Sequence, residues 1–315
     1  MSHKKIIWVL LFSPFLTFAQ YKLEYGVKLG ASNYLGDMGG KQLPRRDFVW
    51  DLKFKATRPD GALYFRKRFR KEWAYRGAFS WVRISGADSL STNPGRRGRN
   101  LSFRNDLYEL SADLQYIFYR PNDVARWGRY RIDFQSYIFA GVAGAYSNPK
   151  AFYNGDWIAL RPLNTEALEK QYSKYILAIP MGVGFSYTVG RKHRIGAELN
   201  YRHTFNDYLD DVSTYYPAKG TLKDPLAIAL SNRNGEIPVD LKSDLPDPAN
   251  YGPNLSKPSE LQKRGDPTHS DVYIGLTVNY SYVIKGKRST FYRSKYNFIT
   301  GVRKKFKKKR VKAKF

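Results

Sequence analysis

The sequence predicts an all-β fold: an eight-stranded antiparallel transmembrane β-barrel with long extracellular loops and a basic C-terminal periplasmic tail. Three observations predict it. Apolar and polar residues alternate in many segments, short and long connections alternate between those segments, and aromatic residues are abundant. The chain has 25 Tyr, 19 Phe and 6 Trp, although its mean hydropathy is only −0.55. A soluble domain seldom needs so many aromatic residues at such low hydropathy, whereas a membrane barrel places them in girdles at both interfaces.

The alternation has a period of two residues, as expected of a strand with two different faces. In the clearest segment Leu177, Ile179 and Met181 alternate with small or polar neighbours. A soluble β-sandwich has the same alternation. However, several segments carry five or six apolar positions on one face, which suits the roughly 9–11 residues that a tilted strand needs to cross a bilayer. The predicted strands, of which the second is weaker and basic, are 23–32, 61–69, 73–81, 108–118, 132–142, 177–188, 195–202 and 272–282.

The connections between the predicted strands alternate in length. An even-stranded barrel with both termini in the periplasm has this pattern, because its periplasmic turns are tight and its external loops are long. The last long connection contains half of the chain's prolines, which cannot donate to a strand ladder, so it is expected to be irregular. Its apolar stretch 226–230 either packs over the barrel mouth as a lid or belongs to a mobile, solvated loop. Short connections are predicted at 70–71, 121–129 and 190–191, and long ones at 35–58, 86–105, 149–171 and 212–268.

The N-terminus has the pattern of a secretory signal peptide. Lys4 and Lys5 precede a mostly apolar run, and Thr17 and Ala19 place small residues at a cleavage site before Gln20. The alternative, an uncleaved anchor, is disfavoured because the run is too short to span a bilayer. We therefore expect a signal peptide at 1–19, an outer-membrane barrel at 20–284 and a basic periplasmic tail at 285–315.

Charge and cysteine content exclude several classes of function. The formal charge of +27 first indicates nucleic-acid binding, but about half of it lies in the tail, where fourteen Lys or Arg residues follow without one acid. An exported protein rarely meets nucleic acid, so no such partner is expected. The absence of cysteine excludes disulfides, thiol catalysis and zinc–thiolate sites. We expect neither a cofactor nor a metal.

The faces of the strands opposite the apolar ones should line a narrow lumen, since eight strands leave room only for side chains. Acids and bases in such an interior are expected to pair, because an unpaired buried charge is unfavourable. A plug of ion pairs is favoured over a gated ion path, although both stay open. The predicted inward charges are Glu24, Lys28, Arg76, Glu109, Asp113, Glu198 and Arg202, with small residues at Gly26, Gly182, Gly184 and Gly275 making room for them.

Candidate catalytic residues are few. Some small barrels modify lipid with Ser, His and an acid near the outer rim, and His203 and His269 are the only candidates near that rim. Neither a GxSxG elbow nor an HExxH helix is present. A histidine on a strand rim is more often a hydrogen-bonding residue than a base, so no enzyme is expected. A small channel and a lipid-modifying barrel remain the alternatives.

Two stretches are more specific than the periodicity: EYGVKLGASNYLGDMGG at 24–40 and NDYLDDVS at 206–213. They resemble the PorG-type outer-membrane barrels of the Bacteroidota type IX secretion system. The strand order, the long last loop and the predicted signal peptide fit as well, so the likeness covers most of the mature chain, whereas the basic C-terminus departs from it. The motif residues are Asn33, Tyr34, Gly36, Asp37, Asp207, Tyr208, Leu209, Asp210 and Asp211.

The three carboxylates of the second stretch, Asp207, Asp210 and Asp211, allow two interpretations. Hard cations such as Ca²⁺ need several oxygen ligands, so the cluster is a candidate cation site. The favoured interpretation is that these carboxylates anchor the loop through hydrogen bonds to backbone N–H groups.

The resemblance implies a non-enzymatic role in protein secretion and gliding-related export. PorG-type proteins associate with the periplasmic ring of the PorK lipoprotein and PorN, and tether that ring to the outer membrane. The contact surface would then be periplasmic, and the expected periplasmic segments are all basic, which suits an acidic partner or anionic lipid headgroups. The tail is either part of this surface or a disordered, solvated extension. The predicted partner-binding residues are Lys67, Arg68, Arg70, Lys71, Arg126, Arg129, Arg191, Lys192, Arg194, Arg303, Lys304, Lys305, Lys307 and Lys308.

Overall fold

The computed structural model describes one compact unit within residues 23–284. The described ranges are 23–38, 54–70, 72–120, 133–189, 192–218, 220–238 and 263–284. The predicted signal peptide, its cleavage site and the basic tail lie outside them. Among the described residues, no helix is long and apolar enough to cross a membrane.

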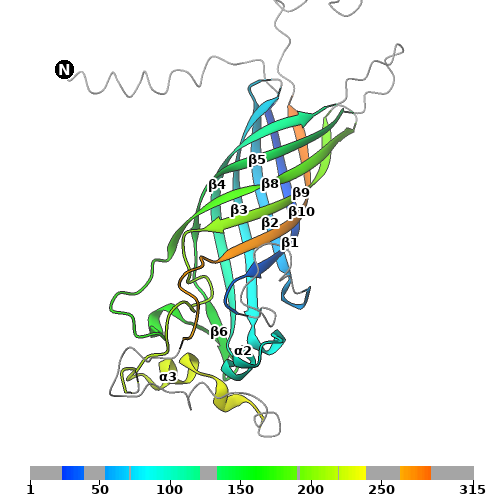
Figure 1. The fold of residues 1–315 in the computed structure, drawn as a ribbon. Coiled ribbons are helices and arrows are strands. Elements are labelled where there is room, and N and C mark those ends of the chain that lie inside the picture. Colours follow the sequence, from blue (N-terminus) through cyan, green and yellow to red (C-terminus); the bar gives the residue numbers. More distant parts are fainter. Residues whose placement is uncertain are drawn as a thin grey trace, which may run out of the picture. The chain divides into compact units, whose positions relative to one another are not determined.

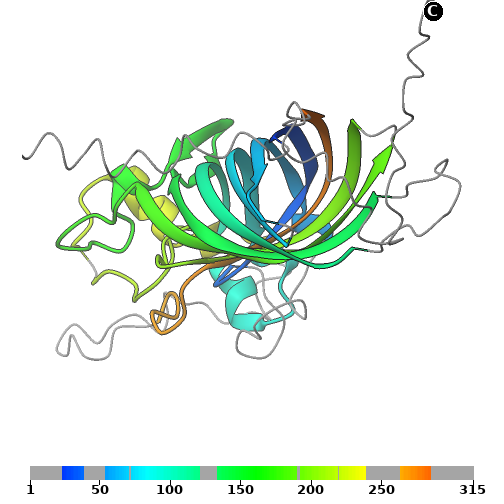
Figure 2. The same ribbon diagram turned by 90° about the horizontal axis from the view of Figure 1, so that it is seen from above.

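Eight long antiparallel strands form a closed barrel (Figures 1 and 2). Each strand pairs with the next along the chain, and the last pairs with the first, from Leu23 opposite Ile284 to Leu35 opposite Val272. Closure leaves no unpaired sheet edge, which is the condition for a sheet to exist in hydrocarbon. The predicted fold class is confirmed. The barrel strands are β1 (Leu23–Leu35), β2 (Arg58–Arg68), β3 (Trp73–Ala87), β4 (Ser102–Tyr119), β5 (Asp133–Tyr146), β8 (Tyr175–Val189), β9 (His193–Thr204) and β10 (Val272–Ile284).

The two ends of the barrel differ. At one end, here called the turn end, lie the short β2–β3 and β8–β9 connections together with the first residue of β1 and the last of β10. The four long connections gather at the other end, the loop end, as predicted (Figure 1). They contain η3 (Phe54–Ala56), η4 (Asp88–Leu90), α2 (Pro94–Arg99), β6 (Lys150–Tyr153), β7 (Asp156–Ala159), η5 (Arg161–Leu163), α3 (Pro225–Ser231) and η6 (Asn234–Glu236).

Several strands are longer than predicted. β3 continues to Ala87 and β4 begins at Ser102, so the predicted long loop 86–105 is much shorter. Beyond the apolar positions, the outward side chains of this hairpin are charged: Arg83, Arg104 and Asp106. The inward residues there, such as Ile84 and Leu107, are apolar, so the apolar face changes from the outer to the inner side of the barrel, and an outward apolar face no longer marks the strand.

The outward face of the barrel is a continuous apolar wall. Outward side chains in the middle of the strands are exposed although they are large and apolar; Leu29, for example, is 69% exposed. Such a band on a closed barrel is the lipid-facing surface of a transmembrane barrel. Its members include Val27, Leu29, Leu63, Phe65, Tyr75, Phe79, Leu110, Leu114, Ile138, Val142, Leu177, Met181, Val183, Phe185, Ile195, Leu199, Leu276 and Val278.

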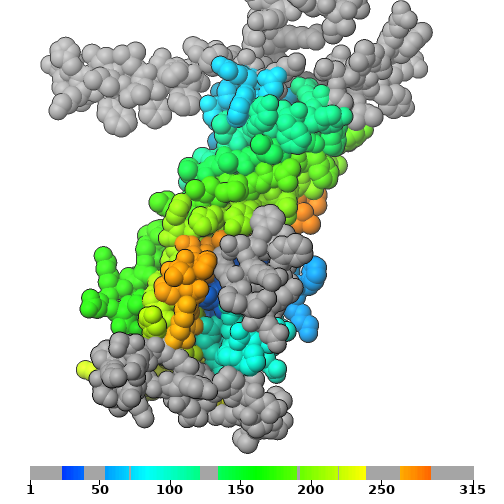
Figure 3. Space-filling view, in the orientation of Figure 1, coloured from blue at the N-terminus to red at the C-terminus, as the bar shows by residue number. Residues whose placement is uncertain are grey.

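A hydrophobic core fills the barrel mouth at the loop end. Inward residues at the ends of the strands, such as Ile84 and Leu107, pack with loop residues such as Leu209 and Leu230. Leu230 belongs to α3, in the apolar stretch 226–230, and is 1% exposed. The packed-lid interpretation of that stretch is therefore confirmed. In the space-filling view the loop segments lie against one another at this end (Figure 3).

Candidate functional site: the lumen and the two ends of the barrel

The middle of the lumen holds an ion-pair network centred on Arg76 of β3. Its guanidinium lies 2.8 Å from the Asp113 carboxylate on β4 and 2.7 Å from Glu198 on β9. The ammonium of Lys28, from β1, is 2.6 Å from the other oxygen of Glu198. The Tyr137 hydroxyl of β5 also donates to Glu198, at 2.6 Å. Five strands are thus connected through side chains that are at most 5% exposed.

Nearer the loop end, Arg202 is 3.0 Å from the Glu109 carboxylate, which also accepts a hydrogen bond from the Tyr273 hydroxyl at 2.6 Å. The Glu24 carboxylate lies 3.2 Å from the Arg66 guanidinium, so all seven predicted inward charges are buried and paired. The geometry is that of a plug of ion pairs.

Glycines make the room that these long side chains need. A Cβ atom added at Gly184 would lie 2.7 Å from Cγ of Glu198 and 2.8 Å from Cζ of Tyr137. At Gly26 a Cβ would lie 2.5 Å from the Tyr64 ring. Because even one methyl group has no space at these positions, the lumen is filled with side chains at this level.

At the turn end, the structure corrects two of the predicted partner-binding residues. Arg68 and Arg194 are 5% and 2% exposed and point into the lumen. Arg68 donates to the Gln135 side chain, and Arg194 donates to Glu24 and to the Thr188 hydroxyl. The physical reason is the side on which each residue falls. Arg68 ends β2 at an inward position of the strand that was predicted there, and β9 begins at His193, before its predicted start, so Arg194 is also an inward strand residue.

Three other predicted residues of that surface face outward or lie exposed. Lys67 is partly exposed on the outer face of β2, and Arg70 and Lys192 are exposed in the two short turns. Lys192 lies over the Tyr282 ring, at 5.8 Å from its centroid. The remaining ones, Lys71, Arg126, Arg129, Arg191, Arg303, Lys304, Lys305, Lys307 and Lys308, lie outside the described residues.

The two motif stretches meet at the loop end, although they are far apart in sequence. The Tyr34 hydroxyl donates to Oδ1 of Asp271 at 2.6 Å, and Oδ2 of Asp271 accepts the backbone N–H of Leu209 at 2.9 Å. Gly36 is required there, because a Cβ would lie 1.9 Å from the Tyr34 hydroxyl. Asn33 donates to the Thr57 hydroxyl at 3.2 Å. The motif residues therefore position the long last loop on β1.

Two carboxylates of the second motif, Asp210 and Asp211, anchor this loop. Asp210 accepts the backbone N–H of Val212 at 2.9 Å, and Asp211 accepts the hydroxyls of Thr165 and Tyr172 at 2.5 and 2.6 Å. The Asp210 contact is of the kind that the anchoring interpretation requires, whereas Asp211 is held by hydroxyl groups. Among the described residues, no three His, Cys, Asp or Glu side chains converge with the geometry of a metal site.

Burial changes the acidity of these groups. It raises the pKa of Asp210, and the nearby carboxyls of Asp271 and Asp37 raise it further. It also raises the pKa of Asp211 to about 6, although the Arg264 guanidinium opposes that shift. Arg264, which is fully enclosed by the loops, is 3.0 Å from the Glu166 carboxylate. The sequence did not indicate that Asp271, Glu166 and Arg264 hold the loops together, because no motif or periodicity connects residues of separate loops.

The two candidate catalytic histidines lie in different surroundings. His203 is outward on β9, with its ring edge against Phe205 at a centroid distance of 5.5 Å. His269 is exposed and lies 3.2 Å from the Asp266 carboxylate and 2.9 Å from the Thr268 hydroxyl.

Comparison with known proteins adds a family. Residues 3–224 match the model of a family described as a domain of unknown function, DUF6089. The chain belongs to the DUF6089 family. No curated protein matches it.

Solved structures similar to this DUF6089 chain are outer-membrane proteins. The attachment invasion locus protein Ail of Yersinia pestis, in complex with a heparin analogue, is 9% identical, with a TM-score of 0.35 over 84% of this chain and 99% of Ail. OprG of Pseudomonas aeruginosa is 9% identical, with a TM-score of 0.38 over 84% of this chain and 97% of OprG. The Neisserial surface protein NspA is 8% identical, with a TM-score of 0.34 over 84% and 96%.

The DUF6089 chain is an outer-membrane β-barrel protein. Its strands close without a free edge, its outward face is apolar, and its polar groups are turned into the lumen. That distribution is unstable in water and stable in a bilayer. The centre of its lumen is occupied by paired side chains of the barrel itself.

Proposed function

We propose that this DUF6089 barrel is a non-enzymatic component of the type IX protein secretion machinery, which anchors a periplasmic ring of the PorK/PorN type to the outer membrane. The observation that carries the proposal is the filled lumen. A lumen in which Arg76, Glu198 and their neighbours occupy the centre offers neither a wide path nor a solvent-filled cleft. The role of the barrel is then to bind a partner protein at its ends.

The motif resemblance supports the choice of partner. The two stretches that resemble PorG-type barrels pack against each other through Tyr34, Asp271 and Leu209. The residues that carry the resemblance therefore also organise the loops of this chain.

The turn end supports the choice of surface. In this proposal it faces the periplasm, as short turns and both termini do in barrels of this class. Lys67, Arg70 and Lys192 are cationic groups there, and the basic tail follows directly after β10. An acidic face of a ring subunit would be attracted to such a surface.

Crosslinked pull-down from membranes tests partner and surface together. The variant Arg70→Glu/Lys192→Glu should recover much less ring protein than the wild type, because it reverses two charges at the turn end. The matched control, Lys170→Glu/Lys223→Glu, makes the same change of charge at exposed positions of the loop end and should leave recovery unchanged. Equal loss in both variants would indicate a general charge effect and contradict the proposed surface.

Removal of residues 286–315 tests the tail. Co-purification with the ring should weaken while barrel insertion, followed by heat-modifiable migration on gels, stays intact. Unchanged recovery would remove the tail from the mechanism. If no ring protein is recovered with the wild type, the secretion role itself is wrong.

A further inference from the structure

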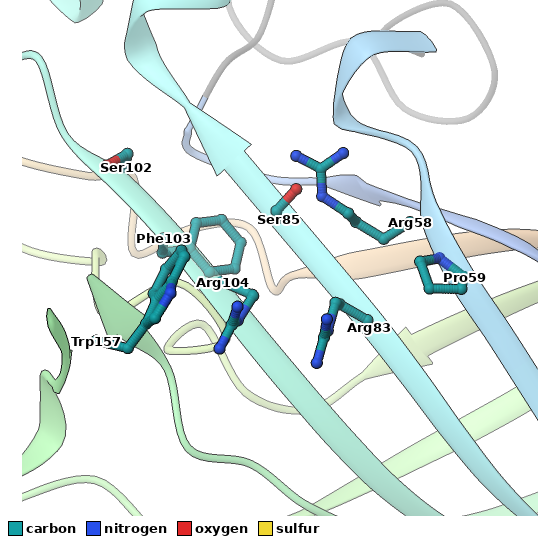
Figure 4. Close-up of a pocket in the computed structure, with 8 residues that line it drawn as sticks. All are labelled: Arg58, Pro59, Arg83, Ser85, Ser102, Phe103, Arg104 and Trp157. Carbon is teal, nitrogen blue, oxygen red and sulfur yellow. The ribbon is translucent and has the colours of Figure 1, made fainter. Parts of the chain in front are cut away.

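A cationic pocket lies on the outer wall at the loop end, away from the lumen and from the turn end. It is formed where β2, β3 and β4 meet the β6–β7 hairpin (Figure 4). Its volume is about 320 Å³. Three of its side chains are arginines, Arg58, Arg83 and Arg104, and one wall is Trp157 of β7. Two hydroxyls, Ser85 and Ser102, complete the polar lining.

The register of β3 and β4 places the pocket relative to the membrane. Trp81 and Tyr108 face outward and are directly opposite each other, and the next outward pair is Arg83 with Asp106. At about 3.3 Å of rise per residue, Arg83 lies roughly 7 Å beyond Trp81 along the strand. Aromatic residues of a barrel mark the interface between hydrocarbon and headgroups. The arginines are therefore at the level of the headgroups.

Among the residues that the structure describes, the positive charge of the pocket is incompletely balanced. Asp106 is the carboxylate next to it, and it is engaged by Arg83, with Nε to Oδ1 at 2.6 Å and Nη2 to Oδ2 at 3.2 Å. Arg104 is 3.9 Å from the same carboxylate, and its buried Nε has no hydrogen-bond acceptor among the described residues. Arg58 donates to the backbone carbonyls of Lys55 and Thr57. Two guanidinium groups, Arg83 and Arg104, thus share one carboxylate, and the third, Arg58, is hydrogen-bonded only to backbone carbonyls among the described residues.

The geometry also presents these groups to a ligand. The Arg104 guanidinium lies over the Trp157 ring, 3.8 Å from its centroid, which holds it in one plane. Arg83 and Arg104 project from neighbouring strands, and the Arg58 guanidinium lies beside Ser85 (Figure 4). The side chains of Arg83 and Arg104 are 31% and 25% exposed, so an anion can reach them. Planar guanidinium groups and hydroxyls suit the oxygens of a phosphate.

We propose that this pocket binds the phosphate monoester of a membrane lipid headgroup in the leaflet at the loop end. The lipid source is favoured over a free anion by what lies next to the pocket. Along the same two strands, Phe79 and Leu110 form an outward pair that is 52% and 68% exposed. An acyl chain can extend over this apolar strip while its phosphate occupies the arginines.

Native mass spectrometry of the detergent-solubilised full chain tests the proposal. Dioleoyl phosphatidic acid, which carries a phosphate monoester, should bind at least about tenfold more tightly than dioleoyl phosphatidylcholine, as expected for one to two charge-assisted hydrogen bonds. This comparison uses only the wild type, so it does not depend on a variant that folds. Equal affinity for the two lipids would overturn the proposal.

The variant Arg58→Gln/Arg104→Gln should lose that preference and retain binding of phosphatidylcholine. The control Lys170→Gln/Lys223→Gln removes two loop-end charges outside the pocket and should keep the preference. An unchanged preference in the arginine variant would contradict the site. If inorganic phosphate at the same concentration occupies the protein as fully as phosphatidic acid does, the site takes a free anion and the lipid assignment is wrong.

Discussion

The lumen and the loop end of this barrel are both buried, but they are held together by different forces. In the lumen, buried charges from separate strands pair in an interior without a large apolar core: Arg76, Asp113, Lys28 and Glu198. At the loop end, apolar side chains pack around a few carboxylates, of which Asp210 lies close to Asp271 and Asp37. The stability of the lumen depends on every buried charge having a partner, whereas the stability of the loop end depends on apolar packing. Each should fail in its own way when perturbed.

The largest effect is expected at Glu198. The variant Glu198→Ala leaves Arg76 with one carboxylate partner and Lys28 without its closest one. An uncompensated buried charge costs about 3–5 kcal/mol of unfolding free energy, measurable by urea unfolding in detergent micelles. The control Glu236→Gln removes the partner of a more exposed pair, with Arg233, and should cost only ~0–1 kcal/mol. Equal losses in the two variants would mean that the lumen network is not a principal source of stability.

A smaller and more local effect is expected in the loop-end core. Leu230→Ala creates a cavity beside a side chain that is 1% exposed and should cost about 2–5 kcal/mol locally. Because the strands stay paired, heat-modifiable migration should persist while limited proteolysis cuts the last loop faster. The control is Ile228→Ala, on the 53% exposed side of the same helix. If Leu230→Ala instead abolished barrel migration, the two regions would not be separable.

The packing of Asp211 should make the loop end sensitive to pH. Its pKa is raised from 3.8 to about 6 by burial, which Arg264 only partly offsets and Glu166 reinforces. Between these values the unfolded loop has lost a proton that the folded loop retains. The free energy of unfolding of the loop therefore falls as pH rises from about 4 to 6.

Limited proteolysis of the last loop at pH 4.5 and 7 measures this dependence: cleavage should be slower at the lower pH. Asp211→Asn should reduce the difference between the two pH values, since the amide does not titrate. A wild-type loop that is more resistant at the higher pH would reverse the predicted sign.

The paired side chains of the lumen should prevent the passage of ions. Wild-type protein in planar bilayers should show no steady conductance, because the central side chains leave no room even for a methyl group at Gly184. Stable unitary currents from the purified wild type would contradict the plug and favour a channel function.

The sequence by itself determined the barrel: the alternation of residues, the rhythm of connections and the inward charges were all read from it. A strand with one face in lipid and the other in a polar lumen must alternate apolar and polar residues. Leu29 and Lys28 could therefore be assigned to the outer and inner face from the sequence alone. Strand ends were less predictable. Arg68, at the end of a predicted strand, and Arg194, just before another, were both expected at the partner-binding surface, whereas their inward positions bury them in the lumen.

Only the tertiary structure decided which residues meet. Tyr34 and Asp271 are 237 residues apart, and Arg99 contacts the backbone of Arg264 from another loop. Likewise, the arginine pocket exists only because β7 folds Trp157 back onto β4. Loop residues have no periodicity that links them, and their contacts follow from how the closed barrel brings its connections to one end.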